Sequence, residues 1–238
     1  CCGYQILHIA SFCTMDCSYC ILQSYFHPPV LQYFAGFKQM KLALDETFKK
    51  KKIFRIGTGE YTDSLIWEKI SLMPRFLVET FAGQTNSLLE LKTKTVNIES
   101  LLGLDHNEKT VIAWSVNTPD IIRTEEKGTA SLTARLKAAQ KAQNAGYKLA
   151  FHFDPIVNYP GCEHAYQQVV KEIFNHVDPS GIVWISLGSF RFMPALKPII
   201  EQRFNESIIC YGEFILGLDN KMRYFKPLRI ELYKDMVS

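Results

Sequence analysis

The sequence predicts an α/β fold, in which a parallel sheet curls into an open, partial (β/α)6 barrel of the TIM type with a C-terminal β-hairpin. Short apolar runs alternate with helical patterns along most of the chain, which is typical of strands joined by right-handed crossovers. There are six such units, fewer than the eight of a closed barrel. Near the end, two short apolar runs flank Asp219–Asn220, a pair that favours a tight turn.

Six β-branched or apolar runs are expected to form the strands: Gln5–Ser11, Ile53–Thr58, Leu88–Lys94, Val111–Val116, Leu149–Asp154 and Ile182–Leu187. Five segments between them are expected to be helical: Asp63–Phe81, Val96–Leu102, Ser131–Ala145, Glu163–Val177 and Ala195–Phe204. Ser131–Ala145 is the clearest, because Ser131 can cap its N-terminus and Gly146 can follow its C-terminus.

We expect residues 1–206 to form the barrel and residues 207–238 a C-terminal extension, with Glu213–Leu218 and Met222–Phe225 as the hairpin and a short helix after it. The hairpin region carries basic and aromatic residues: Lys221, Arg223, Tyr224 and Lys226. These side chains either protect a sheet edge against aggregation or form a nucleic-acid-binding surface.

Bulk composition narrows the class of protein. Hydrophobic residues make up 47% of the 238 residues, so a sizeable core is expected and disorder is not. A net charge of +3 permits a nucleic-acid partner without arguing for one. No apolar run reaches the length of a membrane span, so no membrane partner is expected. Because the sequence starts at Cys1 rather than Met, we expect the natural N-terminus to lie upstream.

The seven cysteines do not resemble a disulfide framework, because their number is odd and five lie within the first 20 residues. This usage is typical of a cytoplasmic enzyme whose thiols bind metal. Cys13, Cys17 and Cys20 form a C-x3-C-x2-C segment directly after the first expected strand. Three thiolates can hold three irons of a 4Fe–4S cubane and leave the fourth iron open for a ligand.

Zinc is the alternative metal, and His8 or His27 could be its fourth ligand. A structural zinc site usually adds a second ligand pair elsewhere in the chain, and the sequence shows none. The position after a strand also favours the cluster, and a redox role for the thiols is the third alternative.

The cysteine spacing resembles the radical S-adenosylmethionine superfamily, and Tyr19, just before the last cysteine, is also typical of it. The resemblance implies that the open iron binds S-adenosylmethionine. One electron from the cluster then cleaves the cofactor to a 5′-deoxyadenosyl radical, which abstracts a hydrogen from the substrate. It further implies a flavodoxin- or ferredoxin-type reductant.

The ends of the next strands carry residues that suit this cofactor. The second ends in Gly57, Gly59 and Glu60, where glycines allow close approach and a carboxylate suits the cofactor's ammonium. Lys94 and Ser115, at the third and fourth ends, could hold the cofactor carboxylate and ribose.

Further candidates lie beyond these strands. Arg135, on the following helix, is another candidate for the cofactor carboxylate, and Ser186 lies at the end of the sixth strand. His152 and Asp154 point to one face at the end of the fifth strand. These two could bind substrate or act in catalysis, or they could be a buried pair that only satisfies itself.

Several stretches also resemble the spore photoproduct lyase group of DNA repair enzymes: Cys17–Gln23, Leu91–Lys94, Ala113–Asn117, Ala130–Arg135 and Phe151–Pro155. The resemblance implies reversal of a methylene-bridged thymine dimer in spore DNA, with a cysteine returning a hydrogen to the product. Those enzymes carry that cysteine just past the second strand and a tyrosine after the last cluster cysteine.

Here residues 57–64 contain no cysteine, and Ile21 follows Cys20. Tyr61 lies in the corresponding neighbourhood and is our candidate for the hydrogen relay. The alternatives are a radical enzyme that modifies another substrate, such as an RNA, a peptide or a metabolite, and a cluster protein without enzymatic activity.

Overall fold

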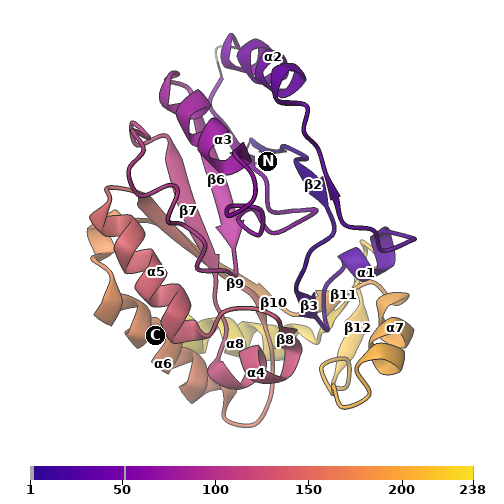
Figure 1. Cartoon of the computed structure of the whole chain (residues 1–238). Coiled ribbons are helices and arrows are strands. Elements are labelled where there is room, and N and C mark those ends of the chain that lie inside the picture. Colours follow the sequence, from indigo (N-terminus) through magenta and orange to yellow (C-terminus); the bar gives the residue numbers. More distant parts are fainter. Residues whose placement is uncertain (1–2, 51, 238) are drawn as a thin grey trace.

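The computed structural model of the chain describes residues 3–50 and 52–237, so Cys1 and Cys2, two of the five cysteines among the first 20 residues, lie outside the described residues. Figure 1 shows a strongly curved sheet with helices on its outer face. Six parallel strands form this sheet in the order of the sequence: β1 (Tyr4–Ile6), β5 (Phe54–Gly57), β6 (Ser87–Thr93), β7 (Thr110–Ser115), β9 (Lys148–Ile156) and β10 (Ile182–Ser189). The predicted partial barrel is confirmed.

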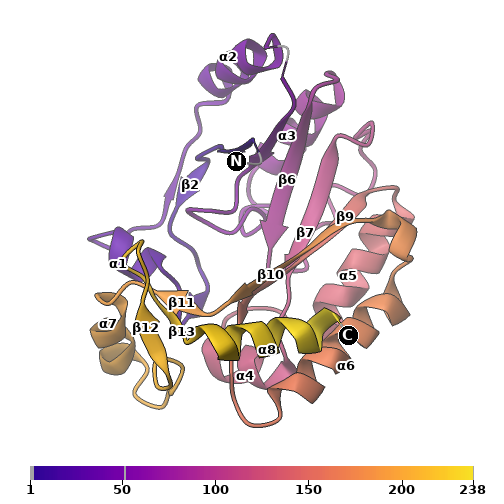
Figure 2. The ribbon, with the colours of Figure 1, turned by 180° about the vertical axis from the view of Figure 1, so that it is seen from behind.

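The outer face of the sheet is covered by helices (Figures 1 and 2). The covering helices are α3 (Met73–Ala82), α5 (Leu132–Asn144), α6 (Cys162–His176) and α8 (Lys226–Val237). Helix α3 packs on β6 and β7, α5 packs on β7 and β9, and α8 packs on α6 and β10. The main core lies between these layers, where Trp114, Phe151 and Phe153 are almost fully buried.

The concave face of the sheet has a different character. A small apolar group of Val111, Ala113 and Ala150, with Trp184 packed against it, lines its floor. Because side chains alternate along a strand, Ser115 and His152 follow on the same face toward the carboxyl ends. Small side chains at the floor and polar ones above it leave room for a cavity at that end.

Short elements extend the fold around the open side of the sheet. They are β2 (Ala10–Ser11), β3 (Asp16–Cys17), α1 (Leu22–Tyr25), β4 (Gln32–Tyr33), α2 (Phe37–Phe48), α4 (Pro119–Glu125), β8 (Glu126–Lys127), the 3₁₀ turn η1 (Pro179–Gly181), β11 (Arg191–Phe192), α7 (Leu196–Arg203), β12 (Phe214–Leu216) and β13 (Met222–Tyr224). The antiparallel pairing of β3 with β8 joins Cys17 to Glu126. This pairing fixes the cysteine segment against the connection between α4 and α5.

Three expectations differ from the structure. The first expected strand is divided, because β1 joins the main sheet whereas β2 pairs with β4. Only the second half of Asp63–Phe81 is helical. Residues 96–98 are irregular and residues 99–102 form turns, in which the backbone N–H of Ser100 donates to Glu68. Helix α2 was not expected, and only Leu44 among its residues is buried.

The predicted C-terminal hairpin and terminal helix are present. Strands β12 and β13 are antiparallel, and β13 also pairs with β11, so the hairpin belongs to a three-stranded sheet that begins before residue 207.

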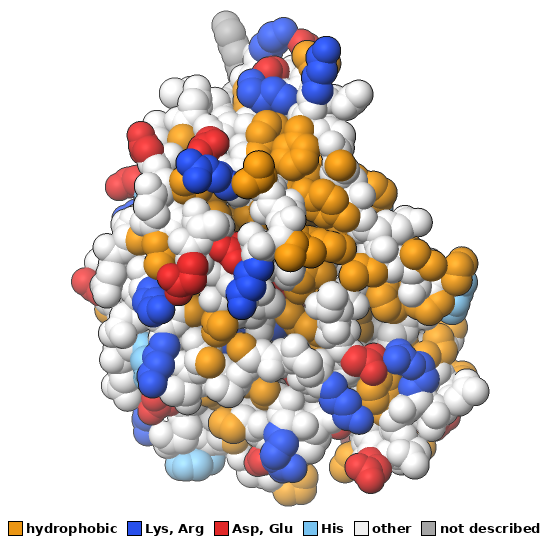
Figure 3. Space-filling view, in the orientation of Figure 1, with side chains coloured by type: hydrophobic (Ala, Val, Ile, Leu, Met, Phe, Trp, Pro, Cys, Tyr) orange, Lys and Arg blue, Asp and Glu red, His pale blue; other side chains and the backbone are white. Residues whose placement is uncertain are grey.

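Side chains on the surface are mixed in kind. Figure 3 shows hydrophobic side chains gathered between α2 and α1 and charged ones scattered elsewhere on that face. Among the described residues, no helix has both the length and the apolar character needed to span a bilayer.

Candidate functional site

A cavity of about 200 Å³ lies at the carboxyl ends of the strands, where a barrel of this type places its chemistry. Residues from the cysteine segment and from four strand ends surround it: Cys13, Met15, Cys17, Tyr19, Cys20, Ile21, Leu22, Gly59, Glu60, Thr62, Asp63, Lys92, Thr93, Lys94, Ser115, His152 and Asp154. Most of the residues that the sequence singled out therefore meet in one place.

All three cysteines of the motif line this cavity, and residues 13–20 are called the cluster loop below. The side-chain amide of Gln23 donates to the carbonyls of Cys17 and Ser18, and these two hydrogen bonds fix the backbone of the loop. Among the residues that the structure describes, no three His, Cys, Asp or Glu side chains converge on one ion position. A cubane needs no such convergence, because each thiolate binds a different iron, so the donor set fits a cluster.

Burial dominates the acidity of these thiols. It raises the pKa of Cys13 and of Cys17 to about 12 and also raises the pKa of Cys20. The thiols therefore keep their protons at neutral pH until a metal replaces them. Loading of a metal at this loop releases protons.

Of the residues expected at the end of β5, Gly59 and Glu60 line the cavity and Gly57 does not. Gly57 lies outside the lining, and a Cβ there would lie 2.0 Å from the Tyr4 hydroxyl. A Cβ at Gly59 would lie 2.8 Å from Lys92 Cβ. Both glycines thus permit close packing, but only Gly59 and Glu60 face the cavity. Glu60 accepts from Lys92 Nζ at 2.7 Å and from the Tyr4 hydroxyl at 3.2 Å.

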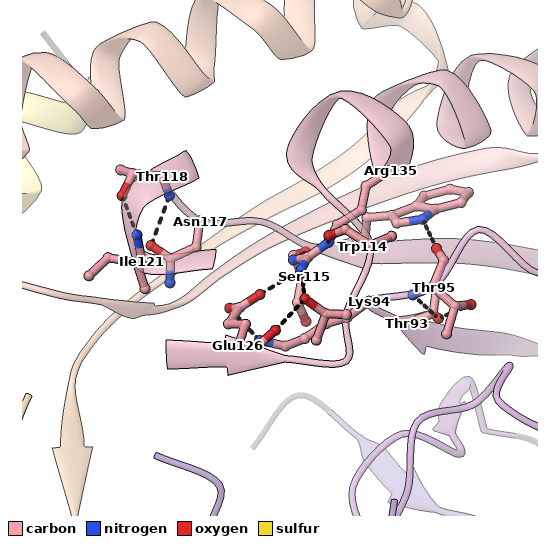
Figure 4. Close-up of polar contacts among 12 residues, drawn as sticks. Thr93, Lys94, Thr95, Trp114, Ser115, Asn117, Thr118, Ile121, Glu126 and Arg135 are labelled. Carbon is pink, nitrogen blue, oxygen red and sulfur yellow. Dashed lines mark hydrogen bonds and ion pairs between the residues drawn. The ribbon is translucent and has the colours of Figure 1, made fainter. Parts of the chain in front are cut away.

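Lys94 lies at the centre of a buried ion-pair network (Figure 4). Its Nζ lies 2.6 Å from Glu126 Oε1 and donates to the Tyr19 hydroxyl, which in turn donates to Glu126. Glu126 is also paired with Arg135 Nη2 at 2.6 Å. Although burial alone would raise it, the two cations hold the pKa of Glu126 at about 2. Lys94 is therefore held in place beside the cysteines.

Arg135 does not reach the cavity, which corrects the expectation that it contacts a cofactor carboxylate. The residue is fully buried. Its guanidinium donates to the carbonyls of Ala130 and Ser115, to the Thr129 hydroxyl and to Glu126. Arg135 supports Ser115 and Glu126 from behind, and Ser115 itself lines the cavity.

His152 and Asp154, from β9, both face the cavity, as the strand alternation predicts. His152 Nδ1 lies 2.5 Å from Ser186 Oγ, and its Nε2 lies 2.7 Å from Glu90 Oε1. Ser186 is absent from the lining, so it positions His152 rather than facing a ligand. Asp154 pairs with Arg191 across a distance of 3.3 Å.

A second cavity of about 400 Å³ adjoins the first and shares Tyr19, Glu60 and Asp154 with it. Tyr61 lines this second cavity, with its ring 4.6 Å from the ring of His8. Lys221, from the hairpin, lines it as well. A ligand in the first cavity could therefore extend toward Tyr61 and the hairpin.

The remaining hairpin residues are placed differently. Arg223 lines a separate cavity of about 240 Å³ with Arg191 and Arg229. Tyr224 is buried in an aromatic cluster, and its hydroxyl accepts from the backbone N–H of Asn158. Its ring packs on Phe214 and serves the core, so the expectation of a nucleic-acid-binding role is corrected for Tyr224. Lys226 is exposed at the start of α8.

Four carboxylate or lysine residues of the site were not among the predicted site residues: Asp63, Glu90, Lys92 and Glu126. Lys92 could have been predicted from the sequence, because residues two apart in a strand point to the same face and Lys92 therefore faces the cavity together with Lys94. Asp63 accepts from the Thr93 hydroxyl at 2.8 Å and from the backbone N–H of Lys94 at 2.7 Å. Neither Asp63 nor Glu126 stands in a sequence pattern that signals these long-range contacts.

Comparison with known proteins places this geometry in a family. A family model described as spore photoproduct lyase matches residues 2–225. The chain is 30% identical over 226 residues to a spore photoproduct lyase of Geobacillus sp. (strain Y412MC61), with 92% of this chain and 63% of the relative covered. It is 26% identical over 222 residues to the spore photoproduct lyase of Bacillus subtilis (strain 168), with 91% and 63% covered. The chain thus spans less than two thirds of the length of these relatives.

Solved structures agree with this assignment. A spore photoproduct lyase double mutant with bound AdoMet and dinucleoside spore photoproduct superposes with a TM-score of 0.89 at 25% identity, with 98% of this chain and 72% of that chain covered. A spore photoproduct lyase complexed with dinucleoside spore photoproduct gives a TM-score of 0.87 at 25% identity, with 96% and 71% covered. With a matching curled sheet and a family model that covers nearly the whole sequence, the chain belongs to the spore photoproduct lyase family.

Proposed function

We propose that this chain is a radical S-adenosylmethionine enzyme, with a 4Fe–4S cluster bound by Cys13, Cys17 and Cys20. The observation that carries the proposal is the meeting of these three thiols with Lys94 and Ser115 in one cavity at the carboxyl ends of the strands. When bound, the cluster would supply the electron that cleaves S-adenosylmethionine to a 5′-deoxyadenosyl radical.

The cavity lining includes residues that would suit three polar groups of the cofactor. Lys94 and Ser115 suit the carboxylate and ribose, and Glu60 suits the ammonium. Tyr19 and Gly59 complete the wall beside the cluster loop. In the described structure Glu60 is paired with Lys92, so cofactor binding requires Glu60 to share or exchange that partner.

For the substrate we propose a thymine lesion in DNA of the spore photoproduct type. Support comes from the family and from the solved structures of spore photoproduct lyases that contain dinucleoside spore photoproduct. Asp154, His152 and Tyr61 would face the lesion, and Lys221, Arg223 and Lys226 would contact the DNA backbone. A flavodoxin- or ferredoxin-type protein in the cytoplasm would supply electrons.

One observation favours a second candidate, a radical enzyme with a different substrate. Among the described residues that line the two cavities, the cysteines are Cys13, Cys17 and Cys20, all assigned to the cluster. Cys162 and Cys210 are buried outside both linings. Among the described residues that line the second cavity, Tyr61 is our candidate for the group that returns a hydrogen to the product.

An anaerobic turnover assay tests the proposal. The protein is reconstituted with iron and sulfide and supplied with dithionite and S-adenosylmethionine, and 5′-deoxyadenosine is measured with and without dinucleoside spore photoproduct. Nucleoside formation with repaired thymidine supports lesion repair, whereas nucleoside without repair favours the other-substrate candidate. A fully loaded cluster that forms no 5′-deoxyadenosine would contradict the radical enzyme. Cys17→Ala is the control for background cleavage.

A further inference from the structure

Two consecutive carboxylates, Glu125 and Glu126, lie at the junction of α4 and β8 and contact the cluster loop. The backbone N–H of Ser18 donates to the carbonyl of Glu125, and the register of β3 with β8 places Cys17 opposite Glu126. The loop is thus bound along its backbone to a segment more than 100 residues away. Both carboxylates are buried.

The two side chains make contacts of different kinds. Both contacts of Glu125 reach the same oxygen, Oε2, which accepts from the hydroxyls of Ser18 and Ser207. Glu126 uses both oxygens: Oε1 accepts from Tyr19 and Lys94, and Oε2 accepts from Arg135. Glu125 therefore accepts only from neutral hydroxyls, whereas Glu126 lies between two cations, the fully buried Arg135 and the partly exposed Lys94.

Glu126 links three parts of the site that are distant in sequence, and Figure 4 shows its contacts with two of them, Lys94 and Arg135. Tyr19 belongs to the cluster loop, Lys94 follows the end of β6, and Arg135 belongs to α5 and also holds the carbonyl of Ser115. The side chain of Lys94 is 16% exposed and that of Glu126 only 1% exposed, so water cannot replace this carboxylate at low cost.

We propose that Glu126 is a positioning residue, which sets the Lys94 ammonium relative to the cluster loop and so determines how tightly S-adenosylmethionine binds. The inference rests on the proposed function, because it takes Lys94 as a cofactor ligand. Glu126 does not line the cavity, so its effect must pass through Lys94 and Tyr19.

Adjacent positions offer a matched pair of variants. In Glu125→Gln, a single amide oxygen can still accept from both serines. In Glu126→Gln, one of the two oxygens becomes an NH₂ group that must face Lys94, Tyr19 or Arg135, which are donors in this network. The same chemical change is therefore expected to preserve the contacts at position 125 and to disrupt them at position 126.

The experiment uses reconstituted protein and two readouts other than turnover: iron per chain, and the dissociation constant of radiolabelled S-adenosylmethionine by equilibrium dialysis. Circular dichroism confirms that each variant is folded at the assay temperature. We expect Glu126→Gln to retain iron and to bind S-adenosylmethionine about tenfold or more weakly than Glu125→Gln. Equal affinities of the two variants would overturn the inference.

A double-mutant cycle shows whether the effect passes through Lys94. If it does, Lys94→Met alone causes most of the loss, and adding Glu126→Gln weakens binding by no more than about twofold. Fully multiplicative losses would contradict the route through Lys94. If Glu126→Gln does not fold, Tyr19→Phe replaces it in the cycle, because Tyr19→Phe removes the two hydrogen bonds of the Tyr19 hydroxyl, with Lys94 and with Glu126, and leaves both ion pairs of Glu126 in place.

The failure of this inference differs from that of the proposed function. Wild-type protein that takes up no cluster, or that binds no S-adenosylmethionine, would refute the proposed function. Wild-type protein that binds both, while Glu126→Gln binds the cofactor as tightly as wild type does, would refute only the role of Glu126.

Discussion

At the scale of single residues, most charged groups that face the cavity already have a partner. Lys92 is paired with Glu60, and Lys94 is paired with Glu126. Such pairs keep long side chains in one rotamer, so a ligand meets groups that are already oriented. The ligand must then compete with the existing partners of those groups. Its affinity depends on how readily each ion pair can accept the ligand as a further partner.

Tyr61 leads to the first residue-scale prediction. If its phenol returns the hydrogen to a thymine product, Tyr61→Phe should still form 5′-deoxyadenosine but lose repaired thymidine by about 100-fold or more. Tyr25 lines the second cavity together with Tyr61, and Tyr25→Phe is the matched control. Chromatography of both products measures the ratio. Undiminished thymidine from Tyr61→Phe would remove Tyr61 from the relay.

At the scale of elements, helix α5 was predictable because its signals are local. Ser131 accepts from the backbone N–H of Ala134, and Gly146 follows the helix with φ of +89°. Residues 96–102 carry a helix-like pattern but are irregular at first and then form turns. Their polar groups bond to distant residues, as when the Leu101 carbonyl accepts from the Tyr147 hydroxyl at 2.8 Å. Such contacts leave no mark in a local pattern.

This contact gives an element-scale prediction. Burial raises the pKa of Tyr147 to about 12 from its ordinary value near 10, so the folded protein favours the neutral phenol. That contribution to stability is fully present below pH 10 and is lost as the pH rises toward 12. At pH 8, Tyr147→Phe should be less stable by about 1 kcal/mol, because it lacks the hydrogen bond.

Urea unfolding of both proteins at several pH values between 8 and 12 measures the difference. We expect the advantage of the wild type to shrink as the pH rises above 10, because the exposed Tyr147 phenol of the unfolded wild type then ionises while the buried phenol of the folded protein stays neutral. The phenylalanine variant has no such group. Other groups that titrate in this range affect both proteins alike. A difference that stays constant across the range would contradict the buried-phenol argument.

At the scale of the whole molecule, the predictable part of the site consists of residues at the carboxyl ends of parallel strands, where barrels of this type place their chemistry. Cys13, Lys94, Ser115 and His152 all follow or end strands that the pattern located, and they meet in one cavity. Glu126 was missed because its place depends on how the connection after α4 folds back onto β3. Arg135 was placed on the correct helix, but burial assigns it to support Ser115 rather than to face a ligand.

The cluster loop contacts segments from across the chain, and this leads to the last prediction. Asp16 is paired with Arg203 of α7 at 2.9 Å, and Ser207 shares Glu125 with Ser18. A cluster that binds only the folded loop therefore stabilises the whole molecule. We expect reconstitution with iron and sulfide to raise the Tm by roughly 5–10 °C, which corresponds to about 3 kcal/mol in a chain of this size.

Differential scanning fluorimetry under argon, before and after reconstitution, measures that increment. Cys17→Ala should show little of it, because a loop with two thiolates cannot hold three irons. Cys162 is equally buried but lies outside the cavity, so Cys162→Ala should start from a lower Tm and still gain the full increment. An equal gain in Cys17→Ala would mean that iron stabilises the protein from somewhere other than the cluster loop.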